Sequence, residues 1–372
     1  MLIIVSFYLL ILGGLSLYSY ALIDPNITFF NHPLWSRFLE WVLQLGYYQR
    51  QLSWQIYLGL VILLFIFQFL FVKNYQKINT VKLAFLIAGL LLLSYPFLSH
   101  DFLKYMFDAR ILTFYHKNPY LTRPIDISYD PWLRFMQWVH QSYRYGWTFL
   151  AIIIVPSALA MGKFLLSFIF FKITFAAFYI LSVFCLSKMN KRWAIIFATN
   201  PLIIIEGLVN SHNDIIGVSL VIIGIYWLFK KPMIGRLFLL LSIGIKYLTL
   251  PVIFISKNKK SWINKLIFIL FIILLFSLFH PAMSSLFMNE ILSWYFIILL
   301  GFLPFYEEII TKLNILFFGL LMSYYPFIRY GEWLSWNEIQ VRHLIIIVFG
   351  LVNLVLFLII PKWRRSVLKF VK

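Results

Sequence analysis

The chain has 372 residues, of which 62% are apolar, 20% are aromatic and only 12% are charged, and its mean hydropathy is +0.89. Soluble domains carry about 25% charged residues, so this composition excludes a water-soluble fold. The formal net charge of +19 is typical of a membrane protein whose loops face anionic lipid head groups, and no nucleic-acid partner is expected. The single cysteine, Cys185, excludes an internal disulfide and a metal site built from cysteines.

Apolar stretches recur along the whole chain, and each can cross a hydrocarbon core of about 30 Å as a helix. The first, residues 2–22, lacks a basic leading segment and a cleavage pattern, so we expect a retained helix. We predict one all-α domain over residues 1–372, a polytopic membrane protein of about eleven transmembrane helices with short interfacial or re-entrant helices. Short helices of that kind are expected near 23–52 and 149–162. Ten of these crossings have definite bounds: besides 2–22, they are expected near 54–72, 83–99, 164–186, 194–209, 215–228, 263–279, 294–305, 313–327 and 344–360.

The Lys and Arg residues fall unevenly on the two sides of these helices. Of the 32, nineteen lie in segments that we assign to the cytoplasmic side and ten lie outside, six of them between residues 100 and 148. Residues 237–255 have basic residues on both flanks, Arg236 and Lys257, so we expect a hairpin broken near Pro251 and not a crossing. The bias predicts that the polar segment 100–148 is a loop facing away from the cytoplasm. Its own basic residues go against the bias and indicate an anionic partner.

This polar segment begins with carboxylates at helical spacing. Asp101, Tyr105 and Asp108 share one face of a helix, whereas Arg110 lies nearly opposite Asp101 unless the helix ends between them. Two carboxylates at the membrane boundary, with cations nearby, can act as a base beside a bound phosphate. The same residues could equally form a helix cap with salt bridges to Lys104 and Arg110. The residues alone leave both interpretations open.

A second polar group begins inside an apolar span. Glu206, Asn210 and Asn213 again have the spacing of one helix face. Glu206 lies within the span itself, where a carboxyl group is costly and is usually functional or paired.

The turn at residues 210–214 completes this group. It contains His212 and Asp214, and it lies on the same predicted side of the membrane as Asp101. The alternative interpretation is a polar turn in which Asn213 or Asp214 caps the next helix. Both interpretations can hold together.

Other features narrow the chemistry. Lys172 and Lys246 interrupt apolar stretches, so each ammonium needs an anion or a route to the interface. Trp294 is interpreted as part of an interfacial aromatic belt. No nucleotide-binding, zinc-protease or serine-hydrolase motif is present, so the donor of any transferred group is expected to be lipid-borne, and no cofactor is expected. The histidines show no metal-ligand spacing, so no metal is assigned.

Five short motifs follow one another along the chain between about residue 95 and residue 255. They are Asp101-x-x-x-Tyr105-x-x-x-x-Arg110, Asn118-Pro119-Tyr120, Tyr145-Gly146, Asn200-Pro201-Leu202 and His212-Asn213-Asp214. Taken together and in this order, these motifs resemble the polytopic GT-C glycosyltransferases, and among them the bacterial polyprenyl-phosphate-mannose-dependent α-mannosyltransferases.

The resemblance implies a role for each matching residue of the first motif. Asp101 is similar to the outward-facing aspartate that acts as general base on the acceptor hydroxyl. Arg110 is implied to hold the donor phosphate, with Tyr105 and Asp108 lining the substrate site. Asp108 and Ala109 depart from the family pattern, which more often has an amide and a glycine there.

For the later motifs the resemblance implies that His212 and Asp214 shape the acceptor or donor pocket and that Lys246 approaches the lipid phosphate. Trp147 departs from the expected proline after Tyr145-Gly146.

The expected function is transfer of a sugar, a hexose such as mannose, from a polyprenyl-phosphate donor to a glycan or lipid acceptor. The resemblance implies inversion at the anomeric carbon, on the extracytoplasmic side of a bacterial plasma membrane. The alternative is a transporter or flippase for lipid-linked sugars, in which Glu206, Lys172 and Lys246 would form an ion-coupled path. A lipid-dependent acyltransferase is disfavoured, because its expected intramembrane histidine, His280, has few polar neighbours.

Overall fold

The computed structural model describes residues 1–27, 29–277, 291–333 and 335–371, and these residues form helices and connecting segments with no strand. His280 lies outside the described residues. The α-helices are α1 Leu2–Tyr18, α2 Pro33–Leu43, α3 Arg50–Lys73, α4 Thr80–Leu91, α5 Asp101–Thr113, α6 Trp147–Leu159, α7 Phe164–Met189, α8 Lys191–Ala198, α9 Asp214–Leu228, α10 Pro232–Ile243, α11 Trp262–Ser277, α12 Leu303–Ile310, α13 Asn314–Met322, α14 Tyr325–Tyr330, α15 Trp336–Ile359 and α16 Pro361–Val371. The 3-10 helices are η1 Ser19–Leu22, η3 Tyr75–Lys77, η4 Pro124–Ile127, η5 Pro131–Phe135, η7 Tyr247–Phe254 and η8 Ser293–Phe302, and the π-helices are η2 Gln44–Tyr48 and η6 Ile203–Val209.

The predicted all-α membrane class is confirmed, but full-length spans are fewer than the expected eleven or so. Within the described residues five helical stretches are long and apolar enough to cross a membrane, or six if the bent pair of α8 and η6 is one span. Five further apolar helices have only 10 to 17 residues. The five long stretches are Leu2–Leu22, Arg50–Lys73, Phe164–Met189, Ser293–Ile310 and Asn337–Ile359.

Breaks in the backbone account for part of this difference. The span expected at 194–209 is bent by 67° between α8 and η6, at the Asn200-Pro201 pair. Proline has no N–H for the helix ladder, and the Asn200 side chain accepts the N–H of Leu202 at 2.9 Å. The span expected at 313–327 is likewise divided into α13 and α14.

The hairpin expected at 237–255 forms, but its predicted break is wrong. Helix α10 ends at Ile243, and the chain turns at Gly244 to Lys246, while Pro251 lies inside the 3-10 helix η7. Proline sets the backbone angle φ of a helical turn and is tolerated there. The turn instead depends on a close backbone approach at Gly244, described below.

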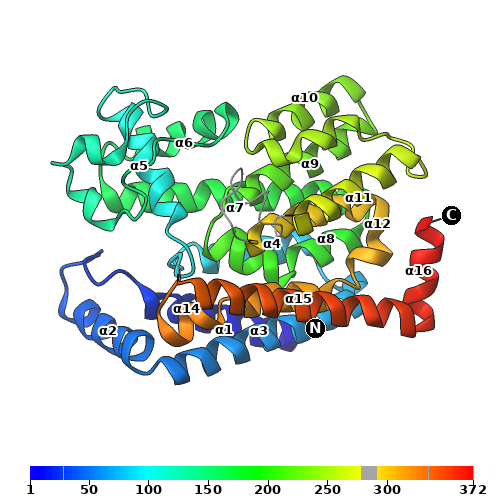
Figure 1. Cartoon of the computed structure of the whole chain (residues 1–372), viewed down its shortest axis with the longest axis horizontal. Coiled ribbons are helices and arrows are strands. Elements are labelled where there is room, and N and C mark those ends of the chain that lie inside the picture. Colours follow the sequence, from blue (N-terminus) through cyan, green and yellow to red (C-terminus); the bar gives the residue numbers. More distant parts are fainter. Residues whose placement is uncertain (28, 278–290, 334, 372) are drawn as a thin grey trace.

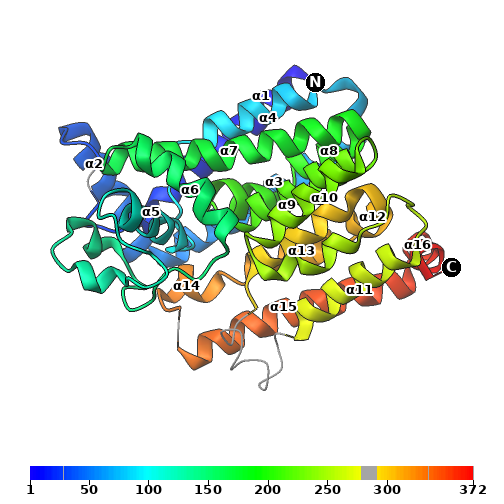
Figure 2. The ribbon, with the colours of Figure 1, turned by 90° about the horizontal axis from the view of Figure 1, so that it is seen from above.

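Helix α7 lies at the centre of the molecule, where it packs against α4, α6, α8 and α9. In Figures 1 and 2 the α5–α6 region lies at one end of the long axis and the C-terminal helix α16 at the other. Aromatic contacts fix α5 against α7, because the Phe102 ring lies 5.2 Å from that of Phe168 and 6.1 Å from that of Phe171. The polar insertion is therefore anchored on the central helix.

The polar segment 100–148, whose predicted side of the membrane stays a prediction, begins with the helix α5. All ten residues from Phe102 to Ile111 on α5 are buried. The average hydropathy of this segment conceals an apolar framework, since large aromatic side chains alternate with Lys104, Asp108 and Arg110 along the helix. The charged groups of α5 are consequently inside the protein and need partners.

Candidate active site

Asp101 and His212 meet where α5 begins. The Asp101 Oδ2 atom lies 3.5 Å from Nδ1 of His212, and the aspartate side chain is 21% exposed while the histidine is fully buried. Burial acts to raise the pKa of Asp101, but His212, Lys246 and His100 outweigh it and hold this pKa below its usual value. Asp101 is thus an accessible carboxylate that stays ionised.

The other side of the His212 ring faces Glu206. The His212 Nε2 atom lies 3.5 Å from Glu206 Oε2, and both side chains are fully buried. Glu206 also accepts hydrogen bonds from Asn210 Nδ2 at 2.9 Å and from Ser293 Oγ at 2.5 Å. Trp294 stacks on the imidazole with ring centroids 3.8 Å apart and an interplanar angle of 15°. This tryptophan is buried, so its interpretation as part of an interfacial belt is wrong.

An irregular backbone places His212 between the two carboxylates. The π-helix η6 carries Glu206, and Ser211 then takes a left-handed φ of 55°, which is unusual for a residue other than glycine. The His212 N–H donates to the Glu206 carbonyl at 2.9 Å. Lys172 binds the carbonyl oxygens of Leu208 and Val209 at 2.8 and 2.6 Å, so this lysine holds the end of η6.

Because of this turn, the expected single face of Glu206, Asn210 and Asn213 is only partly formed. Glu206 and Asn210 are hydrogen-bonded, whereas both side-chain polar atoms of Asn213 are buried without a partner. Asn213 occupies the N-cap position of α9 but makes no capping bond.

Lys246 forms the cationic part of the site together with Asp214. Its Nζ atom lies 2.8 and 3.0 Å from the two carboxylate oxygens of Asp214 and 4.3 Å from the centroid of the Tyr295 ring. The Lys246 side chain is 21% exposed. A partly exposed ammonium beside the ionised Asp101 can receive an anionic group.

The predicted shared face of α5 is present. Lys104 is paired with Asp108, and burial lowers the pKa of this lysine while raising that of Asp108 to about 6. Tyr105 is buried, and its ring packs edge-on against Tyr145 with centroids 5.2 Å apart. The Asp108 Oδ2 atom is buried without a hydrogen-bond partner, whereas the buried Tyr105 hydroxyl interacts with that of Tyr145.

Arg110 does not join this group. Helix α5 continues to Thr113, so Arg110 lies on the face opposite Asp101, as the spacing predicts. Its Nε atom donates to Asp130 Oδ2 at 2.6 Å and its Nη1 atom to the Gly162 carbonyl at 3.0 Å. The guanidinium also lies 4.0 Å from the Phe114 ring centroid and 4.2 Å from that of Trp132. Among the described residues no cluster of three or more metal-binding side chains is found.

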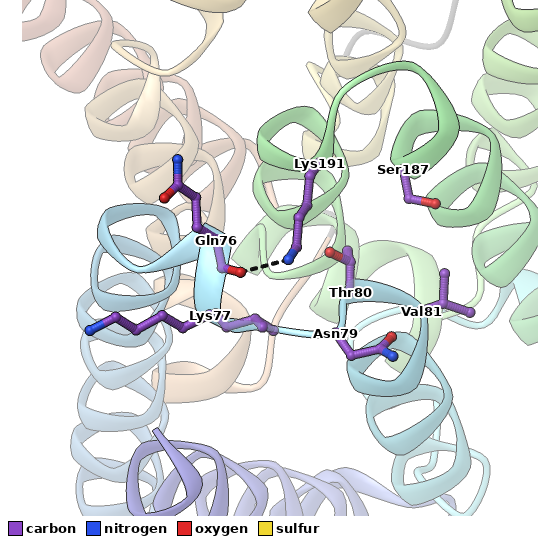
Figure 3. Close-up of a pocket in the computed structure, with 8 residues that line it drawn as sticks. Gln76, Lys77, Asn79, Thr80, Val81, Ser187 and Lys191 are labelled. Carbon is purple, nitrogen blue, oxygen red and sulfur yellow. Dashed lines mark hydrogen bonds between the residues drawn. The ribbon is translucent and has the colours of Figure 1, made fainter.

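A separate pocket of about 390 Å³ lies between the α3–α4 and α7–α8 turns. Figure 3 shows Lys191 reaching toward the Gln76 carbonyl, with which it forms a 2.7 Å hydrogen bond, and Thr80 beside them. Ser187 of this pocket lies sixteen residues beyond Phe171, roughly 24 Å along α7. The pocket is therefore distinct from the site around Asp101.

The comparison with protein families supplies the decisive observation. Residues 11–257 match the family model described as "Alpha-(1->6)-mannopyranosyltransferase, N-terminal domain". The chain belongs to this mannosyltransferase family. No curated protein and no solved structure matched it. The match spans α5, η6 and Lys246, so Asp101, Glu206, His212 and Lys246 all lie in the family domain, and the family resemblance noted from the sequence is confirmed.

Sequence reasoning missed two contributors to this site. Ser293 and Trp294 come from η8, beyond the matched segment, and no local pattern connects them to Glu206 or His212. The one available signal is the polar Ser293 at the start of an otherwise apolar run.

Proposed function

We propose that this membrane glycosyltransferase moves mannose from a polyprenyl-phosphate donor to a hydroxyl group of a glycan or lipid, with Asp101 as general base. The observation that carries the proposal is the partly exposed Asp101 carboxylate, held 3.5 Å from His212 and within electrostatic reach of Lys246. The description of the family supports mannose as the sugar and an α-(1→6) linkage in the product.

The chemistry requires a carboxylate and a cation. The acceptor hydroxyl oxygen attacks the anomeric carbon of mannose, its proton passes to Asp101, and the bond from that carbon to the phosphate oxygen breaks. Polyprenyl phosphate leaves with the electron pair. Attack opposite the leaving group inverts the anomeric carbon, and no covalent intermediate with the enzyme forms.

We assign the donor phosphate to Lys246. Its ammonium is partly exposed and already binds a carboxylate, Asp214, which a phosphate can join or replace. We assign the sugar to Tyr105, Asp108 and Asn213. A carboxylate oxygen of Asp108 and both polar atoms of the Asn213 side-chain amide are buried without a partner, and Tyr105 shares a face of α5 with Asp108 and contacts Tyr145. The Arg110 guanidinium is occupied by Asp130 and Gly162, so we propose that it supports the scaffold instead of holding the phosphate.

A transporter for lipid-linked sugars has no support from the family match. The three groups invoked for an ion-coupled path have separate partners: Glu206 contacts Asn210 and Ser293, Lys172 binds the carbonyls at the end of η6, and Lys246 binds Asp214.

The test is transfer of label from polyprenyl-phosphate [¹⁴C]mannose to candidate acceptors by the purified protein in lipid vesicles. An enzyme moves the label onto the acceptor, with α-(1→6) linkage and release of polyprenyl phosphate. A carrier leaves the label on the polyprenyl lipid and changes only its leaflet, and that result would overturn the proposal.

We further propose that the site faces the extracytoplasmic side of a bacterial plasma membrane. The chain's single cysteine, Cys185, is buried, so a cysteine introduced at an exposed position reports its own side. With a membrane-impermeant thiol reagent, His140→Cys is expected to react in intact cells and Lys77→Cys only after permeabilisation. The reverse pattern would contradict this orientation.

A further inference from the structure

Glu206 is a buried carboxylate to which the proposed reaction assigns no step. Its side chain is fully buried on η6, which together with α8 forms the bent apolar helix pair. An ionised carboxylate in such surroundings is costly unless it is well paired. Hydrogen bonds from Asn210 and Ser293 account for part of its pairing. Glu206 also contacts the ring of His212, 3.5 Å away, and the hydroxyl of Tyr324.

The surroundings of His212 fix how its ring is oriented. Its two nitrogens face two carboxylates, with Nδ1 3.5 Å from Asp101 and Nε2 3.5 Å from Glu206, and neither nitrogen makes a hydrogen bond to any other described group. Trp294 stacks on the ring with centroids 3.8 Å apart and so holds its plane between the two carboxylates.

We propose that Glu206 is a positioning residue for the transfer reaction, which acts through His212 to keep the Asp101 carboxylate ready to receive the acceptor proton. The inference rests on the proposed function. Glu206 takes no proton in the reaction. It holds the ring of His212 from the Nε2 side, and His212 in turn orients the Asp101 carboxylate and lowers its pKa.

Other groups act on the same pair and must be considered in any pH measurement. Asp101 is also influenced by residues of α5 and its N-cap, by Lys246 of the α10–η7 turn and by Tyr145 before α6. Glu206 faces two tyrosines from α3 and the α13–α14 turn. These groups are His100, Lys104, Tyr105, Asp108, Tyr145 and Lys246 around Asp101, and Tyr57 and Tyr324 around Glu206.

The experiment measures kcat, KM for donor and acceptor, and the pH dependence of kcat/KM for Glu206→Gln in lipid vesicles. We expect kcat to fall by about 10- to 100-fold while donor KM stays within about twofold, because Glu206 lies behind His212 and outside the substrate contacts. The acid limb of the kcat/KM profile should move to higher pH. Burial raises the pKa of Asp101, and in this variant His212 opposes that effect less well. Glu206→Asp, which keeps the charge, should recover part of kcat.

Two further variants separate positioning from a merely structural role. In a His212→Asn background, Glu206→Gln should cause no further loss, because a residue that acts through His212 has nothing left to act on. Tyr179→Phe is the matched control, since it removes a fully buried hydrogen bond, 2.8 Å long, to the Ala198 carbonyl. It should lower the melting temperature without changing kcat or the pH profile.

The outcomes distinguish this inference from the proposed function. If wild type transfers mannose and Asp101→Asn does not, but Glu206→Gln keeps the wild-type kcat and pH profile, the positioning role alone is overturned. The positioning role would also be overturned if the losses of kcat in His212→Asn and in Glu206→Gln were fully additive in the variant that carries both substitutions. If Glu206→Gln does not fold, Glu206→Asp serves as the test variant. Its carboxylate is drawn back from His212 by one methylene group, so an unchanged kcat and an unchanged pH profile would contradict the positioning role. A wild type without transferase activity would overturn both proposals.

Discussion

Gly146 lies against the carbonyl oxygen of Gly244 so closely that a Cβ atom at position 146 would come 2.2 Å from that oxygen. The Gly146 N–H donates to the Ile245 carbonyl at 3.3 Å, and the Thr148 N–H donates to the Gly244 carbonyl at 3.0 Å. The beginning of α6 is thereby attached to the turn that carries Lys246. This contact positions the backbone of the turn from which the Lys246 side chain extends to Asp214.

We therefore expect Gly146→Ala to lower transferase activity by about tenfold or more and to lower the melting temperature, because the backbone of α6 must move away from Gly244. Gly89→Ala is the control, since a Cβ there would meet no atom within 4 Å. In the interior of α4 that change should be neutral or stabilise by about 0.5–1 kcal/mol. Equal behaviour of the two variants would contradict the positioning of Lys246 by this contact.

Lys246→Gln tests the assignment of the donor phosphate. Loss of the charge should raise donor KM and lower kcat/KM by about 10- to 100-fold, because hydrogen bonds between charged groups are the strong ones in a site of this kind. Acceptor KM should change little. Lys257→Gln removes the same charge from an exposed loop and should leave all constants unchanged. An unaltered donor KM in Lys246→Gln would remove Lys246 from the phosphate site.

The pH dependence of activity tests the link between Asp101 and His212. A carboxyl group whose pKa is lowered in the folded protein stabilises the fold above its ordinary pKa, and this contribution is lost as the pH falls through the lower value. The base is active in the same ionised form. Burial raises the pKa of Asp101, and His212 is the main group that lowers it. In His212→Asn this pKa should therefore rise, and the acid limb of the kcat/KM profile should move to higher pH. A limb that stays in place would contradict the link.

Arg110→Lys distinguishes a scaffold role from donor binding. A lysine cannot reproduce both the bond to Asp130 and the stacking between Phe114 and Trp132, so we expect a loss of about 2–4 kcal/mol in stability. Donor KM measured below the melting temperature should remain within about twofold. A tenfold rise in donor KM at unchanged melting temperature would instead restore the phosphate role that the family resemblance implies.

Much of this architecture could be predicted from local patterns. The helix beginning at Asp101, its shared face with Tyr105 and Asp108, and the polar turn around His212 all follow from spacing along one segment. The break at Asn200-Pro201 was not predicted, because the segments on either side, 194–198 and 202–205, are apolar and favour a single crossing near 194–209. The break predicted at Pro251 was wrong. This proline lies inside the 3-10 helix η7, which its fixed backbone angle φ suits.

Contacts between residues that are far apart along the chain could not be predicted from local sequence patterns. The pairing of Arg110 with Asp130 joins residues twenty positions apart, and the Ser293 bond to Glu206 spans 87 positions. Such partners are chosen by tertiary packing, which no local periodicity records. The buried state of α5 was missed for a related reason, since the polar side chains that lower its hydropathy are paired inside the protein.

The role of Asp101 as general base is tested most directly by the rate of mannose transfer from polyprenyl-phosphate [¹⁴C]mannose by purified Asp101→Asn protein in lipid vesicles, with donor binding and melting temperature measured on the same sample. We expect a rate at least about a thousandfold below wild type, equivalent to roughly 4 kcal/mol of transition-state stabilisation, with donor affinity and stability nearly unchanged. Transfer at the wild-type rate by this variant would show that Asp101 is not the general base.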